Sequence, residues 1–221
     1  MLLLALDTAT SAITVAVHDG DSIRASAAVA DARRHTEELA PLIQRVMRAA
    51  GAGMDDVTDV AVGTGPGPFT GLRVGLVTAQ VLGASLGLPV HGVASLDALA
   101  HAVVRRGVVG EPFAVATDAR RKEVYWATYA APVQGSADPL TEPAVHRPAV
   151  IPPTVRAGPC AGRGPVLFPD LFARPVPVLD VDAEALADLA VRRLAAGMDM
   201  PVQARYLRRP DALTLAERAA T

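Results

Sequence analysis

Residues 63–73 read Gly-Thr-Gly-Pro-Gly-Pro-Phe-Thr-Gly-Leu-Arg, and this stretch decides the fold class. Its four glycines and two prolines lie between an apolar run at 57–62 and a long apolar-periodic segment. This arrangement is typical of a loop that joins a strand to a helix. Glycines let a backbone or a ligand approach closely, and a helix N-terminus favours anions. A loop needed only for packing fits the same residues, so both interpretations stay open.

Two common phosphate-binding motifs are not met by this loop. The P-loop pattern GxxxxGK[ST] is absent, and the only lysine of the chain is Lys122. GxGxxG also fails, because the residue three after Gly67 is Thr70 and Gly71 comes one position too late. The loop therefore has to be interpreted together with its neighbours.

The hydrophobic periodicity predicts alternating strands and helices. Strands are expected at 2–6, 13–17, 23–29, 57–62, 90–93, 113–117 and 124–129, and helices at 36–50, 70–86, 95–106 and 182–196. Between them, residues 131–177 hold 11 of the 18 prolines, so regular structure there should be short and interrupted. The order predicts an α/β protein with a first lobe at 1–102 and a second, looser lobe at 103–221. The C-terminal tail is a candidate to pack back on the first lobe.

The helix expected at 70–86 carries small residues four positions apart, at Gly71, Gly75, Ala79 and Gly83. A glycine inside a helix costs about 1 kcal/mol relative to alanine, so this strip needs a compensating gain. Close approach of a helix from another molecule would supply it. Packing against the chain's own sheet would supply it equally well.

Composition limits the class of protein. The net charge of −2 gives no global basic field for nucleic acid, although a local contact with RNA stays open. The single cysteine, Cys160, rules out an internal disulfide framework and fits a reducing cytoplasm. The apolar start is stopped by Asp7 without a basic leader, and no run approaches the roughly 18 apolar residues of a membrane span. No two histidines have the spacing of a metal site, so no metal is expected.

Three polar clusters deserve a functional interpretation beside a structural one. Asp7 follows the first strand and precedes two threonines, which suits either a phosphate or magnesium loop or an ordinary turn. Asp118, Arg120 and Glu123 form either a charged site or a solvated hairpin. The arginine-rich segment 205–209 is a candidate contact for a phosphate backbone.

Taken together, these motifs resemble the TsaB (YeaZ) family of bacterial tRNA-modification proteins. The resemblance runs from residue 2 to about 209, and it is carried by residues 4–10, 35–41, 65–73, 92–96, 118–125 and 206–208. It implies an actin-like, Hsp70-like two-lobe α/β (ASKHA) fold and a cytoplasmic protein. It also implies a subunit without catalytic activity or cofactor of its own. Its partners would be the catalytic subunit TsaD and the ATPase TsaE, which transfer a threonylcarbamoyl group from threonylcarbamoyl-AMP to N6 of adenosine 37 in tRNAs that read ANN codons.

The resemblance also implies where partners would bind. The first two helices would pair with TsaD, or with a second copy of the chain as a homodimer, and an adenine nucleotide would sit only at the interface with partners. The expected contact residues are Leu39, Leu42, Ile43, Val46, Gly71, Leu72, Gly75, Leu76, Ala79 and Gly83. The expected remnants of a phosphate loop are Asp7, Thr8, Thr10, Gly65, Gly67 and Thr70. The expected tRNA contacts are Arg205, Arg208 and Arg209.

One position departs from the family pattern, which usually has serine where this chain has Pro68. Proline removes an amide donor and a hydroxyl, so an anion contact at this residue is in doubt. Two other functions remain as alternatives at this point. The chain could be a small-molecule kinase of the same superfamily, with Asp7 and the glycine loop gripping ATP, or a metallopeptidase.

Overall fold

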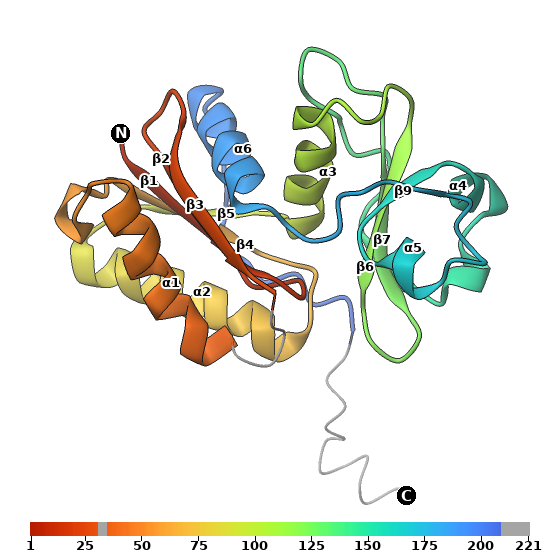
Figure 1. Cartoon of the computed structure of the whole chain (residues 1–221), viewed down its shortest axis with the longest axis horizontal. Helices are drawn as coiled ribbons and strands as arrows, with labels where there is room; N and C mark the ends of the chain where they lie inside the picture. Colours follow the sequence, from red (N-terminus) through yellow and green to blue (C-terminus); the bar gives the residue numbers. More distant parts are fainter. Residues whose placement is uncertain (31–34, 209–221) are drawn as a thin grey trace, which may run out of the picture.

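The computed structural model describes residues 1–30 and 35–208, which form two lobes side by side (Figure 1). Each lobe is built on a mixed sheet of five strands with helices packed on it. The predicted two-lobe α/β class is therefore confirmed. The predicted strands and helices are also present, with bounds that differ by only a few residues.

The sheet of the first lobe has the strand order β3-β2-β1-β4-β5. Its strands are β1 Leu3–Asp7, β2 Ile13–His18, β3 Ile23–Val29, β4 Asp59–Gly63 and β5 Val90–Val93. The first three strands pair antiparallel, whereas β1–β4 and β4–β5 pair parallel. Strands β1 and β2 are buried along their whole length because helices cover both faces of the sheet, whereas β3 alternates as an edge strand does.

Two helices, α1 His35–Ala49 and α2 Phe69–Leu86, lie on one face of this sheet, and α6 Ala183–Ala195 lies on the other (Figure 1). Helix α2 ends at Gly87, which has a φ of 67° as expected of a glycine cap. Helix α6 starts after Asp182, whose side chain accepts a 3.0 Å bond from the amide of Glu184. Although α6 follows the second lobe in sequence, it packs on the first sheet.

The second sheet has the strand order β10-β9-β6-β7-β8. Its strands are β6 Phe113–Asp118, β7 Val124–Tyr129, β8 Ala144–His146, β9 Pro159–Ala161 and β10 Arg174–Pro175. Short helices α4 Pro153–Ala157 and α5 Gly164–Leu167 and two 3₁₀ turns, Met54–Asp56 and Pro148–Val150, complete the structure. The elements within 131–177 are thus short, as the prolines predicted.

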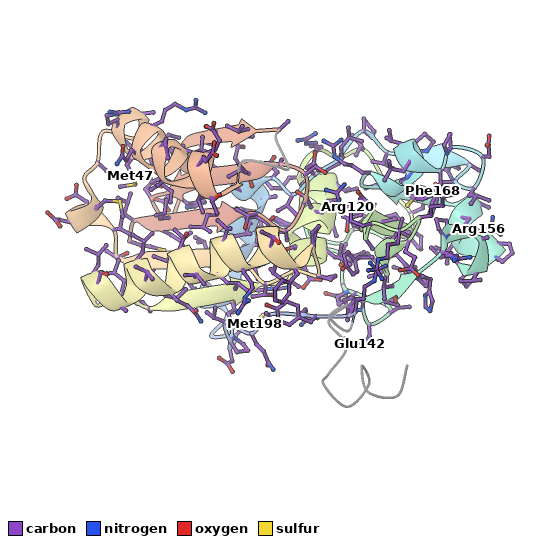
Figure 2. The ribbon with its side chains drawn as sticks, turned by 90° about the horizontal axis from the view of Figure 1, so that it is seen from below. Met47, Arg120, Glu142, Arg156, Phe168 and Met198 are labelled. Atoms are coloured by element: carbon purple, nitrogen blue, oxygen red, sulfur yellow. The ribbon has the colours of Figure 1, made fainter. Side chains whose placement is uncertain are left out.

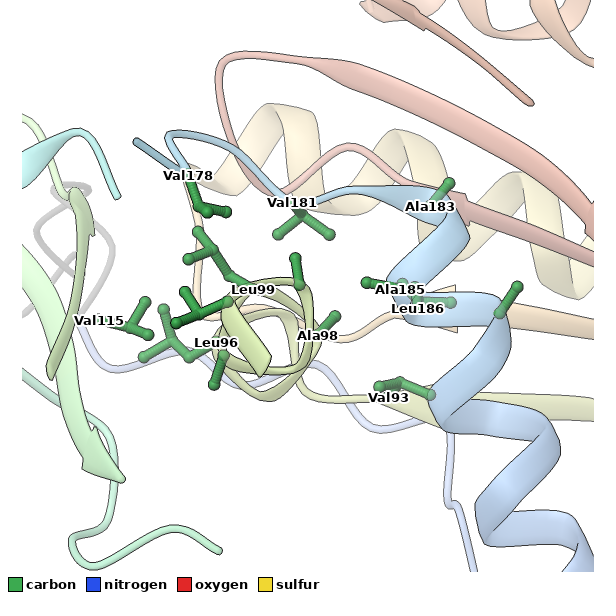
Figure 3. Close-up of a cluster of buried hydrophobic side chains, with 14 of the residues drawn as sticks. Val93, Leu96, Ala98, Leu99, Val115, Val178, Val181, Ala183, Ala185 and Leu186 are labelled. Carbon is green, nitrogen blue, oxygen red and sulfur yellow. The ribbon is translucent and has the colours of Figure 1, made fainter. Parts of the chain in front are cut away.

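Helix α3 Ser95–Arg105 packs against α6 on one side and against the second sheet on the other. The buried side chains around this pair form one hydrophobic cluster that runs from the first sheet to the second (Figure 3). It includes Val93, Leu96, Leu99, Val115, Val181 and Leu186. The two lobes therefore share a core.

Cys160 lies in a separate core of the second lobe, where burial raises the pKa of its thiol to about 12 and leaves it unreactive.

We expected no segment with the length and composition of a membrane span, but helix α2 has both. In the structure its side chains Leu72, Leu76 and Ala79 are buried in the core beneath the first sheet. The helix also carries Arg73 in its second turn. We therefore interpret α2 as a packed helix of the lobe whose opposite side is unusually apolar.

Candidate functional site

The carboxylate of Asp7 connects three segments at the end of the first sheet. One oxygen accepts a 2.7 Å bond from the amide of Ala9, and the other accepts a 2.6 Å bond from the Ser95 hydroxyl. The Ser95 oxygen in turn accepts a 3.0 Å bond from the amide of Gly65. Asp7 is fully buried, and a Cβ added at Gly63 would lie 1.7 Å from its oxygen. Asp7 thus holds the glycine loop in place instead of facing a ligand.

Burial raises the pKa of Asp7 from its ordinary 3.8 to about 6, although its hydrogen bonds oppose this shift. Because the folded chain holds this proton more tightly than the unfolded chain, stability should fall as pH rises from about 4 to about 6. The expected loss is about 3 kcal/mol. Urea unfolding across this range should show it in the wild type and not in Asp7→Asn. Equal pH slopes in both proteins would contradict this role of Asp7.

The hydroxyl of Thr8 inserts into the backbone of α2. It donates a 2.7 Å bond to the carbonyl of Gly71 and accepts a 3.0 Å bond from the amide of Gly75. In a regular helix these two groups bond to each other, so the hydroxyl bridges one step of the ladder. A Cβ at Gly75 would lie 2.5 Å from the Thr8 oxygen. This contact supplies the reason for a glycine inside the helix.

The other expected phosphate-loop residues serve the same local packing. Gly65 has a φ of 85° and precedes a cis peptide bond to Pro66, and a Cβ at Gly67 would meet the Ala9 carbonyl at 2.4 Å. The hydroxyl of Thr10 accepts a 3.4 Å bond from a backbone amide of the connection that leads into α6. Thr70 is exposed on the first turn of α2. The structure therefore brings most of the expected phosphate-loop residues together, but they mainly contact one another and do not line an open site.

The cleft between the lobes beside Pro68 is nearly filled. It has a volume of about 10 Å³, which is roughly the space of one water molecule. Its lining comes from both lobes and comprises Thr10, Ser11, Pro68, Thr117, Asp118, Arg120, Arg163, Leu179 and Asp180. Arg163 and Asp180 close it with a bidentate ion pair, in which two guanidinium nitrogens lie 2.8 and 2.6 Å from the two carboxylate oxygens. A nucleotide needs several hundred Å³, which this cleft does not offer.

The residues expected to contact a partner point into the first lobe. All ten, Leu39, Leu42, Ile43, Val46, Gly71, Leu72, Gly75, Leu76, Ala79 and Gly83, are buried in the chain itself. A Cβ at Gly83 would lie 2.3 Å from the Val90 side chain, so the small strip faces the sheet along much of α2. The prediction thus chose the inward face of both helices. The small residues face inward because the sheet and Thr8, rather than a helix of another molecule, approach the backbone of α2.

The outward face of α2 carries a second strip at Phe69, Arg73, Val77 and Val81. These positions lie two residues from the small ones, which is about 200° around a helix. Phe69, Val77 and Val81 are 50%, 54% and 57% exposed, and the Arg73 guanidinium lies 4.7 Å from the Phe69 ring centre. Phe69, Arg73 and Val77 also border a shallow depression of about 550 Å³, together with Thr36, Thr70, Val74 and Thr78. We call Phe69, Arg73, Val77 and Val81 the α2 outer strip.

The C-terminal tail links the first turn of α2 to the turn between β6 and β7. The ring of Tyr206 contacts the ring of Phe69 in a tilted arrangement with ring centres 5.4 Å apart, and the amide of Arg205 donates a 2.9 Å bond to the Thr64 carbonyl. The guanidinium of Arg208 donates to the Ala119 carbonyl at 3.0 Å and pairs with the Glu123 carboxylate. Arg208 is thus engaged within the chain, the Arg205 side chain is exposed, and Arg209 lies outside the described residues.

Several residues that shape this region were missed from the sequence. The α2 outer strip repeats every four residues just as the glycines do, so its spacing was a signal that could have been used. Ser95 stood out only as part of the motif at 92–96, because its partner Asp7 lies 88 residues away. The pair of Arg163 with Asp180 gave no signal in the sequence.

Comparison with known proteins places this arrangement in a family. The family model described as "TsaD: tRNA N6-adenosine threonylcarbamoyltransferase" matches residues 28–216. A solved structure titled "YeaZ from Pseudomonas aeruginosa" is 30% identical, with a TM-score of 0.78 over 93% of this chain and 99% of that one. The chain belongs to the TsaB (YeaZ) family. This likeness also confirms the predicted actin-like, two-lobe form of the fold.

Other relatives extend the family match. An uncharacterised protein of Mycobacterium tuberculosis is 39% identical over 96% of this chain and 94% of its own length. Escherichia coli "tRNA threonylcarbamoyladenosine biosynthesis protein TsaB" is 38% identical over 129 residues, or 58% of this chain. The chain matches only 55% of that protein's length, and 56% of the length of a similar Mycobacterium leprae protein.

Proposed function

We propose that this chain is a non-catalytic subunit that binds and activates a TsaD-type transferase in the synthesis of threonylcarbamoyladenosine on tRNA. The observation that carries the proposal is the α2 outer strip, in which three large apolar side chains are about half exposed. Exposed apolar side chains gathered on one face of a helix often mark a protein interface. The names of the TsaB relatives and the TsaD family model supply the pathway.

The filled cleft supports a role without catalysis by this chain. An actin-like kinase would hold ATP between the lobes, where this chain has Pro68 and the ion pair of Arg163 with Asp180. We therefore do not propose the kinase alternative. We also do not propose a peptidase, because no cluster of three metal-binding side chains occurs within residues 1–30 and 35–208.

The proposed reaction is transfer of the threonylcarbamoyl group from threonylcarbamoyl-AMP to N6 of adenosine 37 in tRNAs that read ANN codons. TsaD would carry the reactive centre, and the ATPase TsaE would complete a cytoplasmic assembly. Without TsaD, the α2 outer strip would pair two copies of this chain. Any adenine nucleotide would lie at the joint between subunits, since the cleft beside Pro68 holds only about 10 Å³.

The test is reconstitution with TsaD and TsaE from the same organism. We expect this chain to co-elute 1:1 with TsaD at micromolar concentration, to modify no tRNA alone, and to raise the modification rate when added to TsaD and TsaE. Modification by the purified chain alone, or failure to co-elute with TsaD, would refute the proposal.

A further inference from the structure

The turn between β6 and β7 holds three consecutive basic residues in a strained backbone. Arg120, Arg121 and Lys122 have φ angles of 62°, 53° and 62°. Side chains with a Cβ rarely adopt this left-handed region, and three in succession are rarer still. The amide of Glu123 donates a 3.0 Å bond to the Arg120 carbonyl, so Arg121 and Lys122 are the central pair of a tight turn. A turn of this kind favours Asn-Gly at its centre.

Strain of this kind persists where the residues are kept for another purpose. All three side chains are exposed, so the turn presents three basic groups at the surface, and Lys122 is the only lysine in the chain. Two carboxylates flank the turn. Asp118 pairs with Arg120 at 3.1 Å, while Glu123 is held by Arg208 of the tail.

The turn lies at the boundary of the two lobes, where Arg120 borders the same cleft as Pro68 (Figure 2). The tail joins it to the α2 outer strip, since the Tyr206 ring contacts the Phe69 ring and Arg208 bonds to the turn. A subunit docked on that strip would therefore have the basic turn at the rim of the interface. There the turn could contact a ligand bound by the complex.

We propose that residues 120–122 contact the phosphate backbone of the tRNA held by the complex. This inference rests on the proposed function, which supplies the RNA. Guanidinium and ammonium groups bind phosphates without regard to sequence, as a subunit serving several tRNAs requires. Arg208 would support this contact from behind, because its guanidinium bonds to the Ala119 carbonyl and pairs with Glu123.

The test separates charge from strain. Arg121→Asn with Lys122→Gly removes two charges and relaxes the turn. We expect Tm to rise by a few degrees. We also expect the affinity of the TsaD complex for an unmodified tRNA transcript to fall about tenfold at 0.1 M salt, and its salt slope to shrink by about 2. Arg121→Gln with Lys122→Gln should weaken RNA binding equally without the gain in Tm.

The matched control is Arg105→Gln with Arg106→Gln, which removes two adjacent exposed arginines at the far end of α3. It should leave tRNA affinity unchanged. An amine-reactive reagent gives a second readout, since only Lys122 and the N-terminus carry amines. Transfer RNA should protect Lys122 and leave the N-terminus reactive.

Unchanged affinity and salt slope in an intact complex of the Asn-Gly variant would overturn this inference and leave the proposed function standing. Protection of Lys122 by TsaD before RNA is added would assign the turn to a protein contact instead. Should no complex form, the proposed function fails, and the same titration with the chain alone decides whether the turn binds RNA.

Discussion

Val77→Glu is expected to weaken binding of the chain to TsaD by about 100-fold or more, without unfolding it. Val77 lies at the middle of the α2 outer strip and is 54% exposed, so the free chain tolerates a carboxylate there. In the complex the carboxylate would be buried among apolar groups, which costs about 3 kcal/mol at an interface hot spot. Isothermal titration calorimetry with TsaD measures the change directly.

Val133→Glu is the matched control, because Val133 is 68% exposed on the second lobe and away from α2. It should leave affinity for TsaD within about threefold of the wild type, since surface changes outside an interface have small effects. Equal affinity of Val77→Glu and Val133→Glu would move the interface to another face of the chain. Self-association of the free chain should weaken in parallel with TsaD binding.

Gly75→Ala is expected to destabilise the chain by about 2–4 kcal/mol, although alanine is the better helix former. The new Cβ would lie 2.5 Å from the Thr8 hydroxyl, so it both overpacks the site and displaces the bridge to α2. Urea unfolding should show this loss. Gly110→Ala, where a Cβ meets nothing within 4 Å, should stay within about 0.5 kcal/mol of the wild type.

A double-mutant cycle tests the cause of this loss. If the clash with Thr8 is responsible, Thr8→Ala should recover at least about 1 kcal/mol in the Gly75→Ala background, because the methyl then has room. Strict additivity of the two substitutions would show that the cost arises elsewhere in the helix. Binding of TsaD by the folded fraction should be unaffected, since Gly75 is buried.

Local patterns predicted the elements of this fold well but not the faces they present. The glycines of α2 correctly indicated close backbone approach, yet a helix packs by such a strip equally well on its own sheet or on a partner. What decides is the Thr8 hydroxyl, which comes from a turn more than 60 residues earlier. Only the folded chain shows that Gly75 faces inward and Val77 outward.

The candidate site was harder to predict because its chemistry depends on distant pairs. In the sequence, Asp7 after a strand looks like a metal or phosphate ligand. In the structure its carboxylate accepts a hydrogen bond from Ser95, which lies 88 residues later. Arg208 likewise looks available for RNA until Glu123 is found beside it. The basic turn at 120–122 was visible in sequence, but its left-handed backbone was not.

The shared core around α3 and α6 has a mechanical consequence. Hinge motion between lobes needs a boundary that can open without breaking close packing, whereas here buried side chains such as Leu99 and Leu186 continue across it. Opening would expose that core to water, so the chain should melt in a single cooperative step. Under the proposed function, the chain would act as a rigid surface that holds its partner in one shape.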